Sequence, residues 1–248
     1  MPEFSVANWA LYVIAVLLAY SVRGGAGFGG GVVLVPLLAL LAPLQVVVPL
    51  ASALNTLAAI SQGFREWRKV DWREMLRILP FALSGVVVGI FFLNSIDPKP
   101  LSRSFGLFIV AYALYVIFSK GGVAEIPKRW LTPVAAVLSF CAGVIGSVFG
   151  GAAGPIFAMY FNAIRMAKDT FRASMTMLML TLGTTRFVGY FIVGMYTAKV
   201  LFLLAVAVPL AYLGGYAGAR FVRHIDQRVF NRIVGVVLLA SGVALTLK

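Results

Sequence analysis

The sequence predicts an all-α protein that crosses a membrane many times and consists of two inverted repeats of five segments. Its hydrophobic fraction is 61% and its charged fraction 12%, against about half and about a quarter in soluble domains. Apolar runs of about 17–25 residues, long enough to cross a bilayer, recur along the 248 residues and give a mean hydropathy of +0.98. Two glycine-rich motifs interrupt these runs at matching places.

The apolar segments differ in length. They lie at residues 5–22, 32–42, 46–63, 75–93, 101–118, 131–149, 152–162, 172–194, 199–219 and 229–247. Segments 32–42 and 152–162 are too short for about 30 Å of hydrocarbon at about 1.5 Å per residue. Segment 32–42 follows the glycine-rich stretch Gly24–Gly31, and segment 152–162 follows the glycine cluster that lies within Gly143–Tyr160. Because glycine disfavours helix, each repeat is predicted to open with a glycine-broken helical hairpin.

The second half of the chain repeats the first. Phe28-Gly29-Gly30 matches Phe149-Gly150-Gly151 at an offset of 121, and Ala51-Ser52 matches Ala173-Ser174 at 122. At an offset of 129, Pro80, Gly85, Gly89, Asp97, Arg103 and Gly106 match Pro209, Gly214, Gly218, Asp226, Arg232 and Gly235. We therefore predict a first repeat over 1–118, a cytoplasmic linker over 119–130 and a second repeat over 131–248.

Basic residues indicate the orientation, because Lys and Arg collect in cytoplasmic loops. The loops 64–74 and 220–232 are rich in them, whereas 94–100 and 194–199 are sparsely basic. An odd number of segments per repeat then inverts the second copy. The predicted path has 64–74, 119–130, 162–172 and 220–228 inside, and 94–100, 194–199, the N-terminus and the C-terminus outside.

The two helix breaks predict a binding site at mid-membrane. Unpaired backbone groups that face lipid cost several kcal/mol, so the breaks should face protein or a cavity. Helices that restart at Gly31–Val32 and Ala152–Ala153 would aim free N–H groups at that cavity, and such helix ends attract anions. Close helix packing is the alternative role of glycine, and it suits Gly85–Gly89 and Gly214–Gly218 well.

The charged and polar side chains of the sequence favour an anion as the ligand. The carboxylates lie in loops or at segment edges, which argues against a cation channel with acidic rings and a carboxylate proton relay. Arg23 and Arg186 lie within or beside apolar runs, which suggests ligand binding or gating, with snorkelling to an interface as the alternative. Four polar residues could line the cavity or, alternatively, form hydrogen bonds between helices: Ser52, Asn55, Ser174 and Thr176. The predicted substrate-binding residues are Arg23, Gly25, Gly27, Phe28, Gly29, Gly30, Gly31, Ser52, Asn55, Phe149, Gly150, Gly151, Ala152, Ser174, Thr176 and Arg186.

Other activities lack a sequence signal. The Walker sequence GxxxxGK[ST] is missing, and Cys141 is the single cysteine. We therefore expect no enzyme activity, no cofactor and no metal. We also expect no nucleic-acid partner, because basic cytoplasmic loops explain the net charge of +13. The expected partners are a small anionic substrate and the lipid bilayer.

Several stretches make the sequence similar to a known family. RGGAGFGGGVVLVPLL and ASALNTLAAISQ in the first half, and GVIGSVFGGAAGPIFAMYF and FRASMTMLML in the second, resemble the sulfite exporter TauE/SafE family. The resemblance covers nearly the whole chain, although FGGAAGPIF has fewer glycines than is usual. It implies a bacterial plasma-membrane transporter of small sulfur-containing anions, sulfite or an organosulfonate such as sulfoacetate.

Together, the residues and the resemblance predict a secondary transporter that exports its anion by alternating access around a mid-membrane site. An anion channel is one alternative. A non-transporting membrane component, either an intramembrane enzyme or an assembly partner, is the other.

Overall fold

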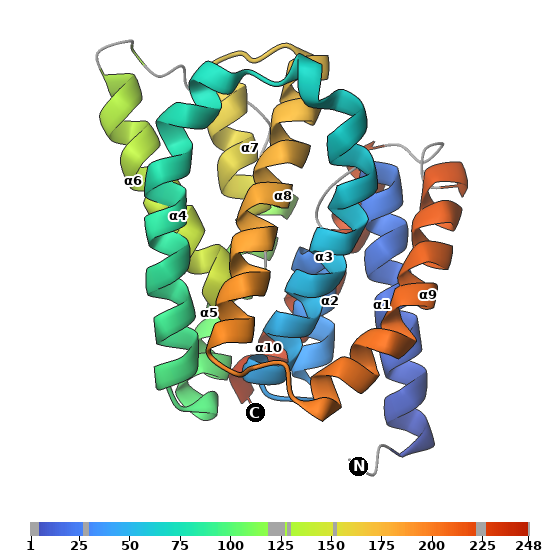
Figure 1. Ribbon diagram of the computed structural model, residues 1–248. Coiled ribbons are helices and arrows are strands. Elements are labelled where there is room, and N and C mark those ends of the chain that lie inside the picture. Colours follow the sequence, from blue (N-terminus) through green and yellow to red (C-terminus); the bar gives the residue numbers. More distant parts are fainter. Residues whose placement is uncertain are drawn as a thin grey trace.

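The computed structural model describes residues 5–26, 30–118, 127, 130–150, 153–221 and 227–247, and within them the chain forms ten α-helices and one short 3₁₀ helix (Figure 1). The helices are α1 (Val6–Ala26), α2 (Gly30–Ala39), α3 (Leu44–Glu66), η1 (Trp67–Lys69), α4 (Trp72–Ser95), α5 (Pro98–Phe118), α6 (Leu131–Val148), α7 (Gly154–Ala163), α8 (Lys168–Ile192), α9 (Ala198–Phe221) and α10 (Gln227–Leu247). The all-helical class is confirmed.

The two short helices follow the glycine-rich stretches, as predicted. Helices α2 and α7 have 10 residues each, so each covers about 15 Å, half of the hydrocarbon thickness. In Figure 1, α2 returns toward the end of the molecule at which α1 starts, and α7 returns toward the end at which α6 starts. Both pairs are therefore helical hairpins whose second arm is too short to cross a bilayer.

The exterior is suited to lipid. Among the described residues, five helices (α1, α4, α6, α8 and α9) are long and apolar enough to cross a membrane. Their outward faces carry large apolar side chains, including Phe91, Phe191 and Leu201. Because a helix satisfies its own backbone hydrogen bonds, such faces are stable against hydrocarbon. The protein is a multi-pass membrane protein.

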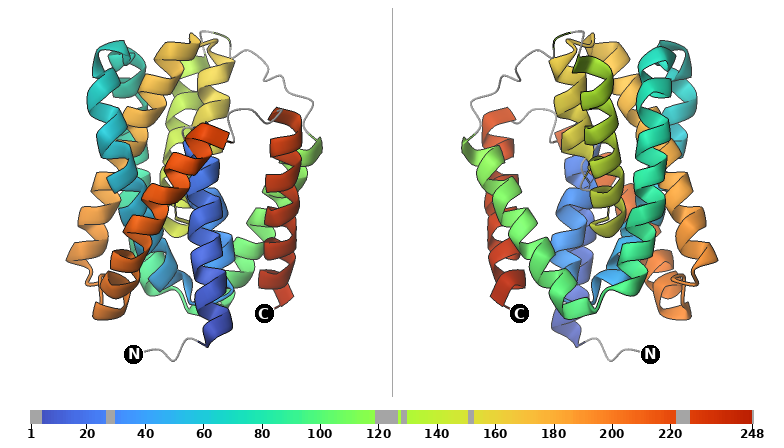
Figure 2. Two further views of the ribbon diagram at one scale, coloured as in Figure 1. Left: turned by 90° about the vertical axis from the view of Figure 1, so that its right-hand side faces the viewer. Right: turned by 90° about the vertical axis from the view of Figure 1, so that its left-hand side faces the viewer.

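The connections divide between two ends of the molecule. Figures 1 and 2 show η1 and residues 164–167 at one end, and residues 40–43, 96–97 and 193–197 at the other. The first residues of α1 and the last residues of α10 share that second end. This grouping agrees with the predicted path of the chain, while the end that faces the cytoplasm stays a prediction.

Helices from the two halves of the chain pair with each other. Helix α4 packs along α6, α1 along α9, and α5 along α10, while α3 crosses α8. If α1–α5 exchange places with α6–α10, the α4–α6 contact becomes the α9–α1 contact, and the other two pairs map onto themselves. Two repeats related by a two-fold axis give this pattern; the inversion and the repeat boundaries stay predictions.

Glycines bring two of these pairs into backbone contact. A Cβ atom added at Gly85 would lie 2.2 Å from the carbonyl oxygen of Phe140, and one at Gly218 would lie 2.0 Å from that of Ser21. Such distances leave no room for a side chain. The packing role predicted for Gly85–Gly89 and Gly214–Gly218 is therefore confirmed.

Candidate functional site

The two glycine breaks meet inside the molecule. A Cβ atom on Gly31, in the first turn of α2, would lie 2.4 Å from the carbonyl oxygen of Gly150. Gly150 has φ +66°, and a Cβ atom there would lie 2.4 Å from Cγ2 of Val35. The left-handed backbone and the close approach both require glycine at position 150. The break between α6 and α7 thus packs directly on the start of α2.

Arg23 lies beside this contact. Its side chain is 7% exposed, and Nη1 donates a hydrogen bond of 3.0 Å to Oδ1 of Asn55 on α3. The Tyr20 hydroxyl donates to the same oxygen over 3.3 Å. A Cβ atom at Gly30 would lie 3.3 Å from Oδ1 and 3.4 Å from Cβ and Cδ of Arg23. We call Tyr20, Arg23, Gly30, Gly31 and Asn55 the Arg23 cluster.

Arg186 lies on the other side of the junction, on α8, and is 4% exposed. Nη1 donates over 2.7 Å to the carbonyl oxygen of Gly146, and Nε donates over 3.1 Å to that of Leu182. The Tyr190 hydroxyl donates over 2.6 Å to the carbonyl oxygen of Ser147. Carbonyls in the last turn of a helix have no partner within the helix. Arg186 and Tyr190 therefore cap the end of α6 where the chain breaks.

The two halves place the arginine and its acceptor on opposite helices. The helices concerned are the broken helix, α1 or α6, and the helix at the crossing of the halves, α3 or α8. In the first half the arginine is on the broken helix, α1, and its acceptor Asn55 is on α3. In the second half the arginine is on the crossing helix, α8, and its acceptor Gly146 is on α6. Each break thus has one guanidinium beside it.

Both guanidinium groups lack a carboxylate partner within the described part of the chain, where the ion pair found joins Arg77 to Glu74. Removing a cation from water is costly unless an anion compensates it. The N–H groups in the first turn of α2 have no partner within the helix and add partial positive charge at the junction. The electrostatics of the site therefore favour a negatively charged ligand.

Other predicted residues occupy different positions. Ser52 is 2% exposed, and its hydroxyl has no hydrogen-bond partner among the described residues. The Ser174 hydroxyl accepts a bond of 3.0 Å from the backbone N–H of Asp71, before the start of α4. Ser174 precedes Arg186 by about 18 Å along α8, so the structure does not bring it to the junction. Thr176 is half-buried on the same part of α8.

Phe149 packs away from the predicted cavity. Its ring lies 4.9 Å from that of Phe105 and 5.3 Å from that of Phe108, both on α5. The contact attaches the second break to α5. Gly25 lies in the last turn of α1. Five predicted site residues lie outside the described residues: Gly27, Phe28, Gly29, Gly151 and Ala152.

Sequence reasoning missed three groups that complete the junction. The Tyr20 and Tyr190 hydroxyls form hydrogen bonds to Asn55 and Ser147. Thr56 lies where α3 contacts α8, because a Cβ atom at Gly183 would lie 2.6 Å from Oγ1 of Thr56. Tyr20 precedes Arg23 by three residues and Tyr190 follows Arg186 by four. Residues three or four apart share a helix face. A tyrosine one turn from each arginine was therefore the signal in the sequence that could have predicted these contacts.

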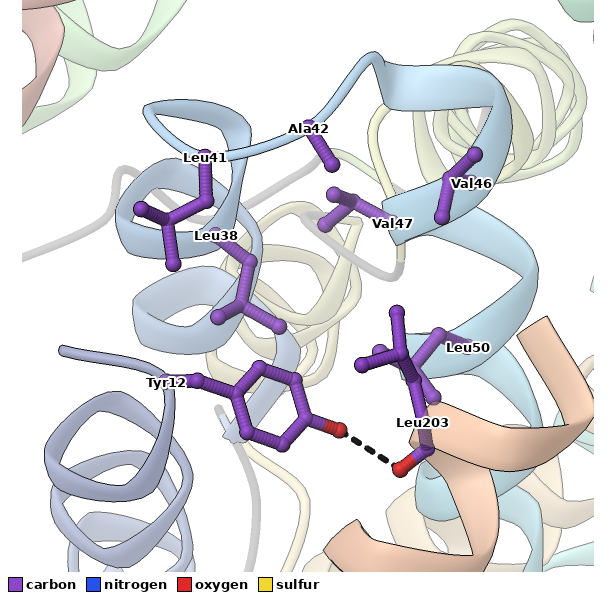
Figure 3. A pocket seen from close by; sticks show the side chains of 8 residues that line it. All are labelled: Tyr12, Leu38, Leu41, Ala42, Val46, Val47, Leu50 and Leu203. Carbon is purple, nitrogen blue, oxygen red and sulfur yellow. Dashed lines mark hydrogen bonds between the residues drawn. The ribbon is translucent and has the colours of Figure 1, made fainter. Parts of the chain in front are cut away.

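A small apolar pocket lies between α1, α2, α3 and α9, near the end at which α1 starts (Figure 3). Its volume is about 10 Å³, room for about one water molecule. The lining residues are Tyr12, Leu38, Leu41, Ala42, Val46, Val47, Leu50 and Leu203. The Tyr12 hydroxyl donates to the carbonyl oxygen of Leu203 over 2.7 Å. With this apolar lining, the pocket is no anion site. The described residues also contain no group of three His, Cys, Asp or Glu side chains that could hold a metal ion.

Comparison with known proteins places the chain among membrane transporters. A family model described as Sulfite exporter TauE/SafE matches residues 12–245. The chain is 25% identical over 194 residues to a "Probable inner membrane transporter protein TsaS" from Comamonas testosteroni, covering 78% of this chain and 80% of the relative. It is also 25% identical over 268 residues to a "Probable membrane transporter protein YunE" from Bacillus subtilis (strain 168), covering 95% and 96%. No solved structure matches the chain.

Proposed function

The chain belongs to the sulfite exporter TauE/SafE family of membrane transporters, and we propose that it is a secondary transporter of a small sulfur-containing anion such as sulfite or sulfoacetate. The observation that carries the choice of an anion is the pair of buried arginines. Arg23 and Arg186 are both more than nine-tenths buried, lie beside the contact between the two breaks, and have no carboxylate partner among the described residues.

The junction supplies what a small oxyanion needs. Its oxygens accept hydrogen bonds, and charge-assisted bonds from guanidinium groups are about twice as strong as neutral ones. Because Gly30 and Gly31 carry no side chain, none shields the backbone N–H groups at the start of α2 from an anion that enters between the breaks. In this proposal the anion binds between the breaks and is reached alternately from either end of the molecule.

Export is the direction that the membrane potential favours. A potential that is negative inside drives an anion outward by about 2.3 kcal/mol per charge per 100 mV. The polar side chains of the described junction are arginine, tyrosine, serine, threonine and asparagine, without a carboxylate. We therefore propose export from a bacterial cell driven by the anion's own gradient and the potential, without proton coupling through a carboxylate.

Flux measurements in liposomes test this function. We expect saturable flux of sulfite or sulfoacetate under an imposed potential. Arg23→Ala should reduce it by about 10- to 100-fold, the loss of one charged hydrogen-bond donor of about 1.5–3 kcal/mol. Arg172→Ala is the matched control, because Arg172 is an exposed arginine on α8.

Two results would contradict the proposal. Folded protein without saturable flux of any tested anion would exclude a transporter of this class. A current that rises linearly with anion concentration would indicate a channel instead.

A further inference from the structure

Asn55 stands where α1, α2 and α3 meet, and its neighbours determine which way its amide points. An arginine guanidinium can only donate hydrogen bonds. The Asn55 atom that lies 3.0 Å from Nη1 of Arg23 must therefore be the oxygen, Oδ1. The Tyr20 hydroxyl, 3.3 Å from the same atom, donates to it as well. Two donors on one oxygen leave the amide a single favourable orientation.

The amide nitrogen then faces the junction of the breaks. A Cβ atom on Gly31 would lie 2.7 Å from Nδ2 of Asn55, and the same atom would lie 2.4 Å from the carbonyl oxygen of Gly150. Among the described residues, Nδ2 donates no hydrogen bond. This amide therefore presents its two N–H donors at the point where the two halves of the chain touch.

A second polar group lies on the same face of α3. Ser52 precedes Asn55 by three residues, a spacing that places both on one side of a helix. Ser52 is 2% exposed, and its hydroxyl has no partner among the described residues. Leaving a buried hydroxyl unpaired is costly. A ligand oxygen at the junction would give this hydroxyl a partner.

We propose that Asn55 is the specificity-determining residue of the transport site, with Tyr20 and Arg23 as the residues that position its amide. This inference rests on the proposed function. The guanidinium of Arg23 and Nδ2 of Asn55 both donate at the junction, and the unpartnered hydroxyl of Ser52 on the same face of α3 can donate as well. A substrate must therefore present acceptor oxygens, as a fully ionised sulfonate or sulfite does, while an isosteric group that carries N–H donors is rejected.

The substitution Asn55→Asp distinguishes the role of Asn55 in packing against Tyr20 and Arg23 from its role as a donor to the ligand. A carboxylate has the same shape, still accepts from Tyr20 and Arg23, and adds an ion pair with Arg23. It replaces the donor at the junction by a charged acceptor that repels anions. We expect a thermal unfolding temperature equal to or above that of the wild type, and a fall of about tenfold or more in the apparent affinity for sulfite in liposome flux.

Two controls complete the experiment. Asn94→Asp makes the same chemical change at an exposed position in the last turn of α4, and it should leave flux unchanged. Methanesulfonate should compete with sulfite for the wild-type protein, whereas methanesulfonamide, its neutral isostere with N–H donors, should not.

The outcomes separate this inference from the proposed function. If the wild type shows no saturable flux, the proposed function fails. If the wild type transports and Asn55→Asp transports equally well, or methanesulfonamide competes as well as methanesulfonate, only the role of Asn55 fails. A lower unfolding temperature for Asn55→Asp would contradict the assigned orientation of the amide.

Discussion

Gly31 shows at the scale of one residue why glycine is needed where the breaks touch. The position of its missing Cβ is 2.4 Å from a carbonyl oxygen of the opposite half and 2.7 Å from Nδ2 of Asn55. Neither neighbour can withdraw freely, because one is backbone and the other is held by Arg23 and Tyr20. The glycine is therefore needed for the contact between the two breaks.

Gly31→Ala is expected to destabilise the protein by about 1–3 kcal/mol, the usual cost of overpacking, and to reduce flux because it separates the breaks. Thermal unfolding in detergent measures the first effect. Gly215→Ala is the control, since a Cβ atom there meets no atom within 4 Å. Equal unfolding temperatures for Gly31→Ala and the control would show that the junction is loosely packed.

Arg23 and Arg186 differ in the groups that accept their hydrogen bonds. Arg186 donates from two nitrogens to two backbone carbonyls, whereas the described bond of Arg23 is to a side-chain amide. A lysine keeps the charge but lacks the planar fork of donors.

Arg186→Lys should therefore lower the unfolding temperature more than Arg23→Lys does, because it leaves a carbonyl at the end of α6 without its partner. Unfolding followed by intrinsic fluorescence in detergent would measure both. The opposite ranking would contradict the capping role of Arg186.

At the scale of elements, one polar contact ties the second hairpin to the first half of the chain. The Tyr160 hydroxyl, at the far end of α7, donates over 2.9 Å to Oε2 of Glu74 on α4. Glu74 also forms an ion pair with Arg77. The contact attaches the short helix α7 at the end away from its glycine break.

Tyr160→Phe should cost about 0.5–1.5 kcal/mol, the net value of a hydrogen bond, while keeping the packing of the ring. Tyr212→Phe is the matched control, since Tyr212 on α9 is 79% exposed. Chemical or thermal unfolding of both variants against the wild type checks the difference. A loss no greater than that of the control would show that α7 is held by its apolar contacts alone.

The whole molecule presents its connections at two ends, and this arrangement makes the orientation testable. In a Cys141→Ser background, single cysteines at exposed positions 94 and 198 lie at the end with the first residues of α1, and those at exposed positions 67 and 167 lie at the opposite end. Because the basic loops predict that this opposite end is cytoplasmic, a membrane-impermeant thiol reagent should label 94 and 198 from outside intact cells. Labelling of 67 or 167 under the same conditions would overturn the predicted orientation.

The crossing of α3 and α8 places the candidate site at the centre. Each half contributes one of the two helices, one broken hairpin and one buried arginine. Asn55 and Arg186 both lie on the crossing helices, so any relative movement of the two halves changes the junction that they line. This is the whole-molecule reason to expect that transport couples binding to movement of the halves.

The sequence alone determined the helical class, the short second arms and the glycine packing of α4 and α9, and it singled out both arginines, whose role in binding stays a prediction. These features depend on local requirements: lipid demands long apolar helices, and glycine interrupts them or allows close approach. Only the tertiary structure decided which side chains meet. It joined Asn55 to Arg23 and Tyr20, bound Arg186 to the end of α6, and turned Ser174 toward Asp71. Those contacts span 32 to 103 residues of sequence. They depend on the rotation of each helix about its axis and on its crossing angle, which the packing of the whole molecule sets.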